Sequence, residues 1–256
     1  MVSQTWPRVW RSLPWLDAPG AVQMALDEWL LEQHRTGQMP PILRFYSWSH
    51  PTLSLGYHQK NWPTHWSDVI WQDGPIDMVR RPSGGRAVLH QGDITYALIV
   101  SGLSGKRTQI YEFLCQFLIE GWRSLGIALE FGQAGRGYIH NPNCFSTATA
   151  ADLVTPDGSK LIGSAQLRRD RTLLQHGSMR LTPNPDLFLQ VFQTPLSLSA
   201  SLQDLLASIS PDAVVEALSQ AACEIFGVSL VPYHLTPHDW DAVNALVHRY
   251  AVKHVT

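Results

Sequence analysis

The chain has 256 residues, of which 45% are hydrophobic and 16% charged, and its formal net charge at pH 7 is -2. This composition is typical of a folded globular protein and excludes a long disordered or strongly charged tail. Nothing in the net charge favours nucleic acid or an anionic membrane surface as a partner. We expect a single domain over residues 1–256, because a chain of this length can bury a large core without a second one.

Cysteine content and hydropathy limit the class further. The three cysteines are odd in number and lack the spacing of zinc ligands, so neither a disulfide framework nor a metal site is predicted. No run approaches the ~18 uncharged apolar residues of a membrane-spanning helix, and arginines and prolines interrupt the N-terminal segment. We therefore expect a cytoplasmic protein with no membrane contact.

The first half of the chain combines two helices with several strands. Apolar residues recur at helical spacing over residues 21–37, and a second amphipathic helix is predicted over residues 106–126. Five short apolar runs between them predict strands, and one antiparallel sheet is the simplest arrangement for these runs. The runs cover residues 42–48, 52–58, 76–81, 86–90 and 94–100.

The second half begins with a polar, glycine-bearing region and then predicts a small β-meander over residues 151–155, 160–169 and 172–181. The last third is predicted to be helical, over residues 211–227 and in a final helix with Thr236 as N-cap. The fold class is therefore α+β, with a central, mostly antiparallel or mixed sheet flanked by helices.

A glycine pair flanked by arginines separates two of the predicted strands. The backbone at the glycines can approach a ligand closely, and the guanidinium groups can pair with an anion or a carbonyl. A hairpin turn with solvated arginines is the alternative, and the glycine pair alone favours it. The loop lacks the context of a dinucleotide site and the lysine of a P-loop, so it specifies no nucleotide. Its residues are Arg80, Arg81, Ser83, Gly84, Gly85 and Arg86.

A lysine begins the strand predicted at 160–169. After Lys160, the residues Gly163, Ser164 and Ala165 add little side-chain bulk, so a slot for a narrow ligand can form beside them. A solvated lysine at a strand end is the more common alternative.

Cys144 lies in a polar loop outside any helical pattern, where a thiol is available for reaction. It is a candidate nucleophile, although free cysteines more often have a structural role. Cys115 and Cys223 lie inside helical patterns and are expected to be inert. His90 and His176 each follow a strand-like run, near strand ends of one sheet. We expect hydrogen-bonded core histidines there, because no carboxylate partner stands at a fixed spacing.

Taken in order, these stretches resemble the biotin and lipoate protein ligase superfamily, and most closely the cysteine-dependent octanoyltransferases that are similar to lipoate-protein ligases. The motifs are MALDEWLL, LRFYSWSHPTLSLGYHQ, RRPSGGRAVLHQGDITYAL, NCF and KLIGSAQLRRDRTLLQHGS. The resemblance implies the catalytic domain of that superfamily, which has a class II synthetase-like fold. It also implies that Cys144 takes the acyl group as a thioester and that Lys160 binds or polarises the acyl carbonyl.

The same resemblance implies an acyl site, partners and no cofactor. The donor would be octanoyl-acyl carrier protein, and the acceptor a lysine on a lipoyl carrier protein such as the glycine-cleavage H protein or a 2-oxoacid dehydrogenase acyltransferase subunit. The protein is expected to act as a monomer. Besides the glycine loop, the implied acyl-site residues are His90, Gly163, Ser164, Ala165, Gln175, His176 and Gly177.

Other activities stay open. A lipoate ligase would require ATP and magnesium, but ligases usually carry a third glycine where this chain has Arg86, and here a cysteine precedes Phe145 and the chain ends at residue 256. An amidotransferase between lipoylated proteins and a binding module without turnover are the remaining alternatives. The loop after the cysteine departs from the family pattern at residues 148–149 and 151–152. Arg168, Arg169 and Arg171 are a candidate dock for an acidic carrier, or a solvated strand end.

Overall fold

The computed structural model describes residues 2–72, 74–132 and 152–252. Its largest element is an eight-stranded sheet with the order β11-β12-β13-β14-β9-β3-β2-β15. The strands in that order are Glu130–Phe131, Asp152–Val154, Lys160–Arg169, Thr172–Arg180, Asp93–Val100, Ile42–Trp48, Val9–Ala18 and Ser229–Pro232.

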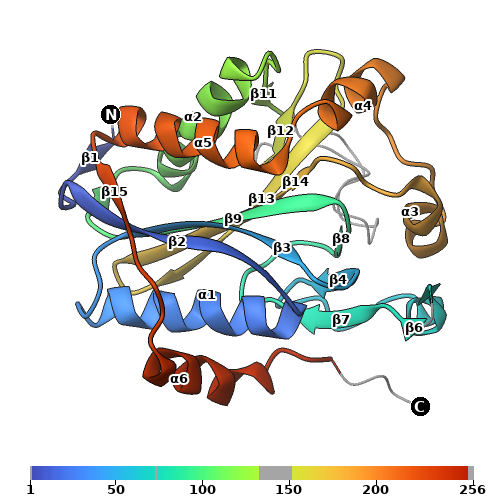
Figure 1. Ribbon diagram of the computed structural model, residues 1–256, viewed down its shortest axis with the longest axis horizontal. Coiled ribbons are helices and arrows are strands. Elements are labelled where there is room, and N and C mark those ends of the chain that lie inside the picture. The colour runs from blue at the N-terminus through green and yellow to red at the C-terminus, as the bar shows by residue number, and fades with distance from the viewer. Residues whose placement is uncertain (1, 73, 133–151, 253–256) are drawn as a thin grey trace.

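Helices cover both faces of this sheet (Figure 1). Helices α2 (Arg107–Ser124) and α5 (Pro211–Phe226) lie on one face, and α1 (Gly20–Arg35) and α6 (Pro237–Val247) lie on the other. Each face has its own apolar core, because the strands are buried on both sides and alternate residues point to opposite faces. The α+β class with a mixed sheet flanked by helices is thus confirmed.

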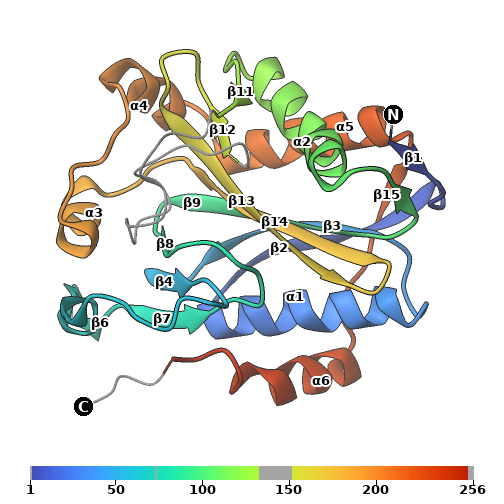
Figure 2. The same cartoon turned by 180° about the vertical axis from the view of Figure 1, so that it is seen from behind.

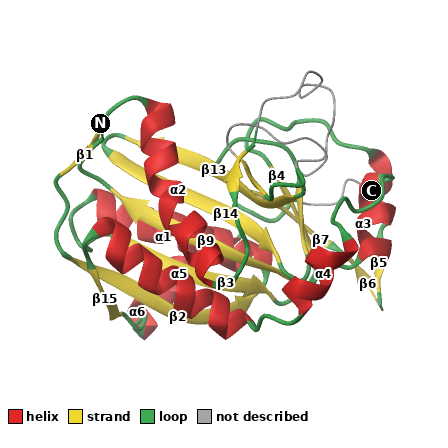
Figure 3. Cartoon of the chain, turned by 90° about the horizontal axis from the view of Figure 1, so that it is seen from above, coloured by secondary structure: helices red, strands yellow, loops and turns green. Residues whose placement is uncertain are grey.

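A smaller sheet with the order β7-β4-β8 lies at one end of the long sheet, next to α3 (Figure 3). Its strands are β7 (Asp77–Arg80), β4 (Thr52–Leu55) and β8 (Val88–His90), and α3 is Pro185–Phe192. The remaining elements are α4 (Ala200–Ala207), η1 (Thr64–Asp68) and two short ribbons: β1 (Ser3–Gln4) with β10 (Leu103–Ser104), and β5 (Ile70–Trp71) with β6 (Gly74–Pro75).

The expected single antiparallel sheet is wrong in two respects. The strands predicted at 52–58, 76–81 and 86–90 form the separate small sheet, and three strand pairs are parallel: β2 with β3, β15 with β2, and β4 with β7. The sequence pattern also does not predict β2, because Pro14 interrupts the apolar pattern of this strand. A register irregularity between Leu13 and Leu16 accommodates that proline within the strand.

Local sequence signals account well for the helices. In α6 the Thr236 hydroxyl accepts from the Asp239 N–H, which confirms Thr236 as the predicted N-cap, and the Asp239 carboxylate accepts from the Thr236 N–H, which completes a capping box. Helix α5 begins with Pro211 in its first turn and ends at Gly227, whose φ of 64° is the left-handed conformation of a C-cap glycine. These caps satisfy backbone groups that a helix end otherwise leaves unpaired.

The chain after α6 runs beneath α1 toward the small sheet (Figure 2). There the Arg80 N–H donates to the Tyr250 carbonyl, and the Val252 N–H donates to the Met78 carbonyl, both at 2.9 Å. The C-terminal segment therefore pairs with β7, the strand that leads directly into the glycine loop. No helix in the described part of the chain has the length and apolarity needed to cross a membrane.

Candidate active site

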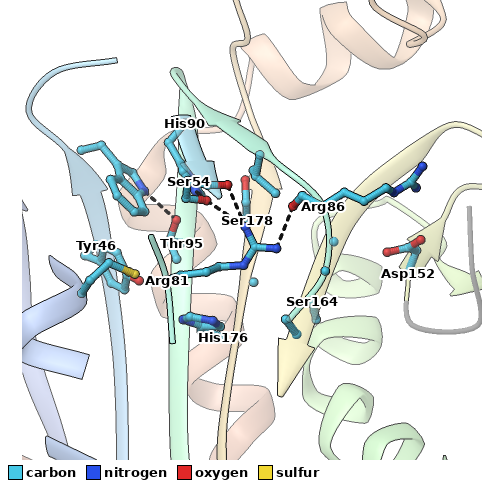
Figure 4. Close-up of a pocket in the computed structure, with 17 residues that line it drawn as sticks. Tyr46, Ser54, Arg81, Arg86, His90, Thr95, Asp152, Ser164, His176 and Ser178 are labelled. Atoms are coloured by element: carbon cyan, nitrogen blue, oxygen red, sulfur yellow. Dashed lines mark hydrogen bonds between the residues drawn. The ribbon is translucent and has the colours of Figure 1, made fainter. Parts of the chain in front are cut away.

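A cavity lies where the small sheet meets the long sheet and the start of α1 (Figure 4). Aromatic, aliphatic and small residues supply much of the wall, and hydroxyl, imidazole and charged groups interrupt it. The lining residues are Met24, Tyr46, Trp48, Ser54, Arg81, Gly85, Arg86, Val88, His90, Thr95, Asp152, Gly163, Ser164, Ala165, His176, Gly177 and Ser178.

The cavity brings together most of the residues that the sequence singled out. Those that line it are Arg81, Gly85, Arg86, His90, Gly163, Ser164, Ala165, His176 and Gly177. Those that lie behind its wall or away from it are Arg80, Ser83, Gly84, Lys160 and Gln175. Cys144 lies outside the described residues, so its predicted role as nucleophile stays a prediction.

The two consecutive arginines of the glycine loop serve as internal supports. Arg81 is buried, and its guanidinium donates to the carbonyls of Ser54 at 2.8 Å, Gly84 at 2.8 Å and Arg86 at 2.7 Å. The Arg80 guanidinium donates to the carbonyls of Gly56 and Gln59 instead, and Arg80 does not line the cavity. The expectation of a turn with solvated arginines is therefore wrong for Arg81.

A buried hydrogen-bond chain connects the same loop to α1. The Ser83 hydroxyl bonds to His176 Nε2, and His176 Nδ1 lies 3.1 Å from Asp27 Oδ2. Because the Asp27 carboxylate is an acceptor, we assign the proton on His176 to Nδ1, which leaves Nε2 to accept from the Ser83 hydroxyl. The Ser83 side chain is buried and does not line the cavity, so this chain holds the loop in place and offers no open nucleophile.

Asp27 is the centre of a fully buried polar network under α1. Arg44 donates to it from β3, with Nη2 2.7 Å and Nε 2.9 Å from Oδ1, and the Tyr46 hydroxyl donates to Oδ2 at 3.2 Å. Burial alone would raise the pKa of Asp27, but the positive charge of Arg44 and the hydrogen bond from His176 outweigh it and leave the pKa below its usual value. Asp27 is therefore ionised and fixes both Tyr46 and His176 in the cavity wall.

A second buried carboxylate organises the opposite part of the wall. Asp93 Oδ2 accepts from Ser178 at 2.6 Å and from Thr95 at 3.3 Å, and lies 2.8 Å from His90 Nδ1. Burial lowers the pKa of His90, and the nearby Asp93 offsets this only in part. Trp48 stacks on the His90 ring, with ring centroids 3.8 Å apart.

Both histidine expectations are partly corrected. His90 and His176 are indeed buried and hydrogen-bonded, but they lie on strands of different sheets, and both have carboxylate partners. Asp93 stands three residues after His90, a spacing that was visible in the sequence. Asp27 is 149 residues from His176, so only the fold brings these two together.

Lys160 is buried and forms an ion pair with Asp152, with Nζ 2.7 Å from Oδ1. The alternative of a solvated lysine is therefore wrong. Asp152 lies opposite Gly163, whereas Val154 lies opposite Lys160, so the register shifts between the two strands. Such a bulge re-aims a side chain, and here it lets Lys160 reach the carboxylate that lines the cavity.

Strand β14 shows why the cavity needs glycine. A Cβ on Gly177 would lie 2.7 Å from the Tyr96 ring and 2.6 Å from Ser164 Oγ, so a larger residue would disrupt the wall. On the same face of the strand, two residues earlier, Gln175 donates to the Tyr96 hydroxyl at 2.9 Å and contacts Cys115 Sγ at 3.4 Å. Burial raises the pKa of the Cys115 thiol to about 12, which agrees with the prediction that it is inert.

The candidate carrier dock on the β13–β14 hairpin is weakened. Arg169 donates to Glu32 at 2.7 Å and to Glu28 at 2.8 Å, so α1 already neutralises its charge. Asp170 at the hairpin tip binds Arg35. The exposed basic surface at this tip is therefore smaller than the sequence indicated.

Sequence reasoning missed several of the residues that build the wall, chiefly Asp27, Arg44, Asp93 and Asp152. For Asp27 a signal existed, because an acid within the buried stripe of a helix must have a partner. In the described part of the chain, no group of three or more His, Cys, Asp or Glu side chains is placed to hold a metal ion.

Comparisons with known proteins agree with this architecture. A family model, the lipoyl protein ligase A/B catalytic domain, matches residues 19–223. An octanoyltransferase LipM from Kyrpidia tusciae is 34% identical over 266 residues, which cover 95% of this chain and 96% of the relative. An octanoyltransferase LipM from Anoxybacillus flavithermus is 38% identical over 198 residues, which cover 73% of this chain and 70% of the relative.

Two solved structures show the same fold. A lipoate-protein ligase A bound with ATP superposes with a TM-score of 0.74 at 21% identity, over 94% of this chain and 95% of that chain. A bipartite lipoate protein ligase from Thermoplasma acidophilum, described with its E2 lipoyl domain, superposes with a TM-score of 0.69 at 20% identity, over 95% of this chain and 93% of that chain.

Proposed function

The chain belongs to the lipoyl protein ligase A/B catalytic domain family, and from this premise we infer that it is an octanoyltransferase of lipoate biosynthesis. The resemblance seen in the sequence is thereby confirmed. The observation that carries the activity is the 34% identity to an octanoyltransferase LipM over nearly the full length of both chains. The donor, the acceptor and the roles of individual residues are proposals that rest on the cavity and on the family motifs.

We propose that the cavity holds the octanoyl chain. Met24, Val88, Trp48 and Ala165 offer apolar surface along its wall. Burial of about seven alkyl carbons at ~0.8 kcal/mol each contributes about 5 to 6 kcal/mol, which corresponds to a Kd of roughly 0.1 mM. This affinity is too weak to retain the acyl group while one carrier protein leaves and another arrives, so a covalent acyl-enzyme is advantageous.

In the proposed reaction the Cys144 thiolate attacks the thioester carbonyl of octanoyl-acyl carrier protein. A new carbon–sulfur bond forms, the bond to the carrier sulfur breaks, and the released thiolate takes up a proton. The acceptor lysine, as a neutral amine, then attacks the enzyme thioester, forms the amide and expels the Cys144 thiolate, while its surplus proton leaves to solvent. Lys160 supports both steps, because a nearby ammonium favours a thiolate and stabilises negative charge on the carbonyl oxygen.

The partners follow from this scheme. We propose lipoyl carrier proteins as acceptors, namely the glycine-cleavage H protein and 2-oxoacid dehydrogenase acyltransferase subunits. A thioester donor is already activated, so the reaction requires no nucleotide and no other cofactor. We also propose that residues 1–256 act as one catalytic domain and as a monomer, in the cytoplasm, where a free thiol stays reduced.

Intact-protein mass spectrometry tests the proposal. The purified protein is mixed with octanoyl-acyl carrier protein without ATP, and an adduct with the mass of one octanoyl group is expected. The adduct should disappear in Cys144→Ala and should pass to an added apo-lipoyl domain. Cys223→Ala is the matched control, because it removes a different cysteine in α5. Absence of any adduct in wild type, or an adduct that survives Cys144→Ala, would contradict the mechanism.

A lipoate ligase is the second candidate, because the fold matches a lipoate-protein ligase A bound with ATP. It predicts that free lipoate or octanoate with ATP and magnesium modifies the apo-lipoyl domain, and that Cys144→Ala still does so. An amidotransferase would differ from both the octanoyltransferase and the ligase in the acyl donor that it uses. It would accept octanoyl from an octanoylated carrier domain and leave octanoyl-acyl carrier protein unused.

A further inference from the structure

The buried Arg81 side chain turns the carbonyl groups of the glycine loop toward itself. Its guanidinium donates to the Gly84 carbonyl through Nη2 at 2.8 Å and through Nε at 3.2 Å, and to the Arg86 carbonyl at 2.7 Å. Figure 4 shows Arg81 reaching from one side of the cavity toward Arg86, whose own side chain continues toward Asp152. Arg81 thus acts on the loop backbone at two points.

This arrangement decides where the Gly85 N–H points. In a trans peptide the C=O and N–H groups point in opposite directions, and no cis peptide is present among the described residues. The Gly84 carbonyl is directed at Arg81, so the N–H of the same peptide group, that of Gly85, is directed away from it. In the part of the chain that the structure describes, this N–H has no hydrogen-bond acceptor.

Two glycines allow the loop to take this form. Gly85 has φ +97°, and a Cβ on it would lie 2.8 Å from Arg81 Nη2. A Cβ on Gly56 would lie 1.9 Å from the Gly85 carbonyl oxygen, so that carbonyl rests against the Gly56 backbone. Residues with side chains at either position would displace the peptide that carries the N–H.

Gly85 lines the cavity and is also exposed, so it lies at the opening. An acyl chain attached to a carrier protein must keep its thioester at the opening, because the carrier stays outside. Asp152, the partner of Lys160, lines the same cavity. On the premise of the proposed octanoyl transfer, we propose that the Gly85 N–H donates a hydrogen bond to the thioester carbonyl oxygen, and that Arg81 is the positioning residue that aims it.

The chemistry of this contact is that of an oxyanion donor. When a thiolate adds to the carbonyl carbon, the π electrons move onto the oxygen, and the charge returns when the carbon–sulfur bond to the donor breaks. A donor that already points at this oxygen stabilises the charge without reorganisation, and loss of one such donor typically lowers kcat roughly 10²- to 10³-fold. The positive charge of Arg81 lies behind the peptide and polarises it further.

Isotope-edited infrared spectroscopy can detect the proposed hydrogen bond from the Gly85 N–H to the thioester carbonyl, because the bond lowers the frequency of the carbonyl band. With [1-¹³C]octanoyl-acyl carrier protein, the carbonyl band of the wild-type acyl-enzyme should lie at lower frequency than that of the free donor. Arg81→Lys keeps the charge but loses the planar fork that spans the loop carbonyls. In this variant the band should move toward the free value and single-turnover acylation should slow about 10²-fold, with little change in the Kd of the donor.

Val191→Ala is the matched control. It removes buried side-chain volume from the core beneath the small sheet without touching the loop carbonyls, so it should lower stability and leave the carbonyl band unchanged. If Arg81→Lys does not fold, glycolic acid in place of Gly85 replaces the N–H with an ester oxygen and changes no side chain, and the same loss of the band shift is expected. Glycolic acid in place of Gly84, which does not line the cavity, should leave the band shifted.

Two results would overturn the inference while leaving octanoyl transfer intact. One is a wild-type acyl-enzyme whose carbonyl band equals that of the free donor. The other is an Arg81→Lys variant that keeps the wild-type band and rate, or that loses only donor affinity, as expected if Arg81 itself binds an anion. If wild type forms no octanoyl adduct at all, the proposed transfer is the part that fails, and that result is obtained before any variant is tested.

Discussion

Two buried ion pairs that lie beside the cavity have the same contact distance but differ in the cation and in the elements that carry them. Arg44 Nη2 and Lys160 Nζ each lie 2.7 Å from a carboxylate oxygen, of Asp27 and Asp152 respectively. Asp27 lies in the middle of α1 and faces central strands, whereas Asp152 begins a three-residue strand near the edge of the sheet. The planar guanidinium holds one fixed geometry, while the ammonium is a compact charge on a flexible stem.

This difference in construction suits the two ion pairs to different roles. The Asp27 network, with Tyr46 and His176 as further donors, is suited to holding the cavity wall rigid. The Lys160 charge is suited to being shared with a substrate, because its single rotatable head can turn from one acceptor to another. Substitutions in each pair should separate a structural role from a role in the reaction.

Loss of Asp27 should have the largest effect. Asp27→Ala leaves the Arg44 charge buried without its carboxylate, and removal of one partner of a buried pair costs about 3 to 5 kcal/mol. Urea unfolding followed by tryptophan fluorescence measures this change. The double variant Asp27→Leu with Arg44→Met should recover most of the loss, and a cost below about 1 kcal/mol for Asp27→Ala would show that the network is not a structural anchor.

Loss of Lys160 should lower the rate of the reaction more than the stability of the fold. In Lys160→Met the rate of acylation by octanoyl-acyl carrier protein should fall roughly 10²- to 10³-fold, because the variant lacks the charge that we propose stabilises the thiolate and the oxyanion. Single-turnover mass spectrometry measures the rate. Lys106→Met, which changes an exposed lysine before α2, should react like wild type. A Lys160→Met variant with an unchanged rate but reduced stability would assign Lys160 to the wall instead.

His90 should make stability depend on pH. Burial lowers its pKa below the value of about 6.5 in the unfolded chain. Between these two pKa values the unfolded state binds more protons, so the free energy of unfolding falls as pH drops below about 6.5, by up to ~1.4 kcal/mol per pH unit. His90→Asn should flatten this slope in urea unfolding at several pH values. An equal slope in wild type and variant would refute the assignment.

The surface network of Glu32 with Arg35 and Arg169 should have the smallest effect. Glu32→Gln should cost no more than about 1 kcal/mol, because exposed ion pairs gain little over hydration. The cost should shrink further at high salt, where screening weakens exposed pairs. Thermal unfolding at low and high salt measures both. A larger loss of stability that does not depend on salt would show that the Glu32 network is a structural anchor, like the pair of Asp27 and Arg44.

The proposed acyl site could be anticipated in outline. The cavity is lined, as the motifs implied, by Gly85, Arg86, Gly163 and Gly177. Such positions can be predicted, because small residues and glycines at special backbone conformations are recognisable in a sequence. Arg81 was identified as an anion-pairing group, but its position beneath the loop makes it a support for the backbone. The sequence contains no signal for that difference, since only the tertiary structure shows which carbonyls face the guanidinium.

By itself, the sequence determined the main helices, the N-cap at Thr236, the family and many of the strand segments, but not β2 or β15. These features are local, since apolar periodicity, caps and turns act within a few residues and motifs follow the chain order. Only the tertiary structure decided that the predicted strands divide between two sheets and that some of them pair in parallel. It also decided that His176 contacts both Asp27 and Ser83, although Ser83 is 93 residues away from it in the sequence. Contacts of this kind depend on packing that joins distant segments, because each buried charge must find whichever partner the fold places beside it.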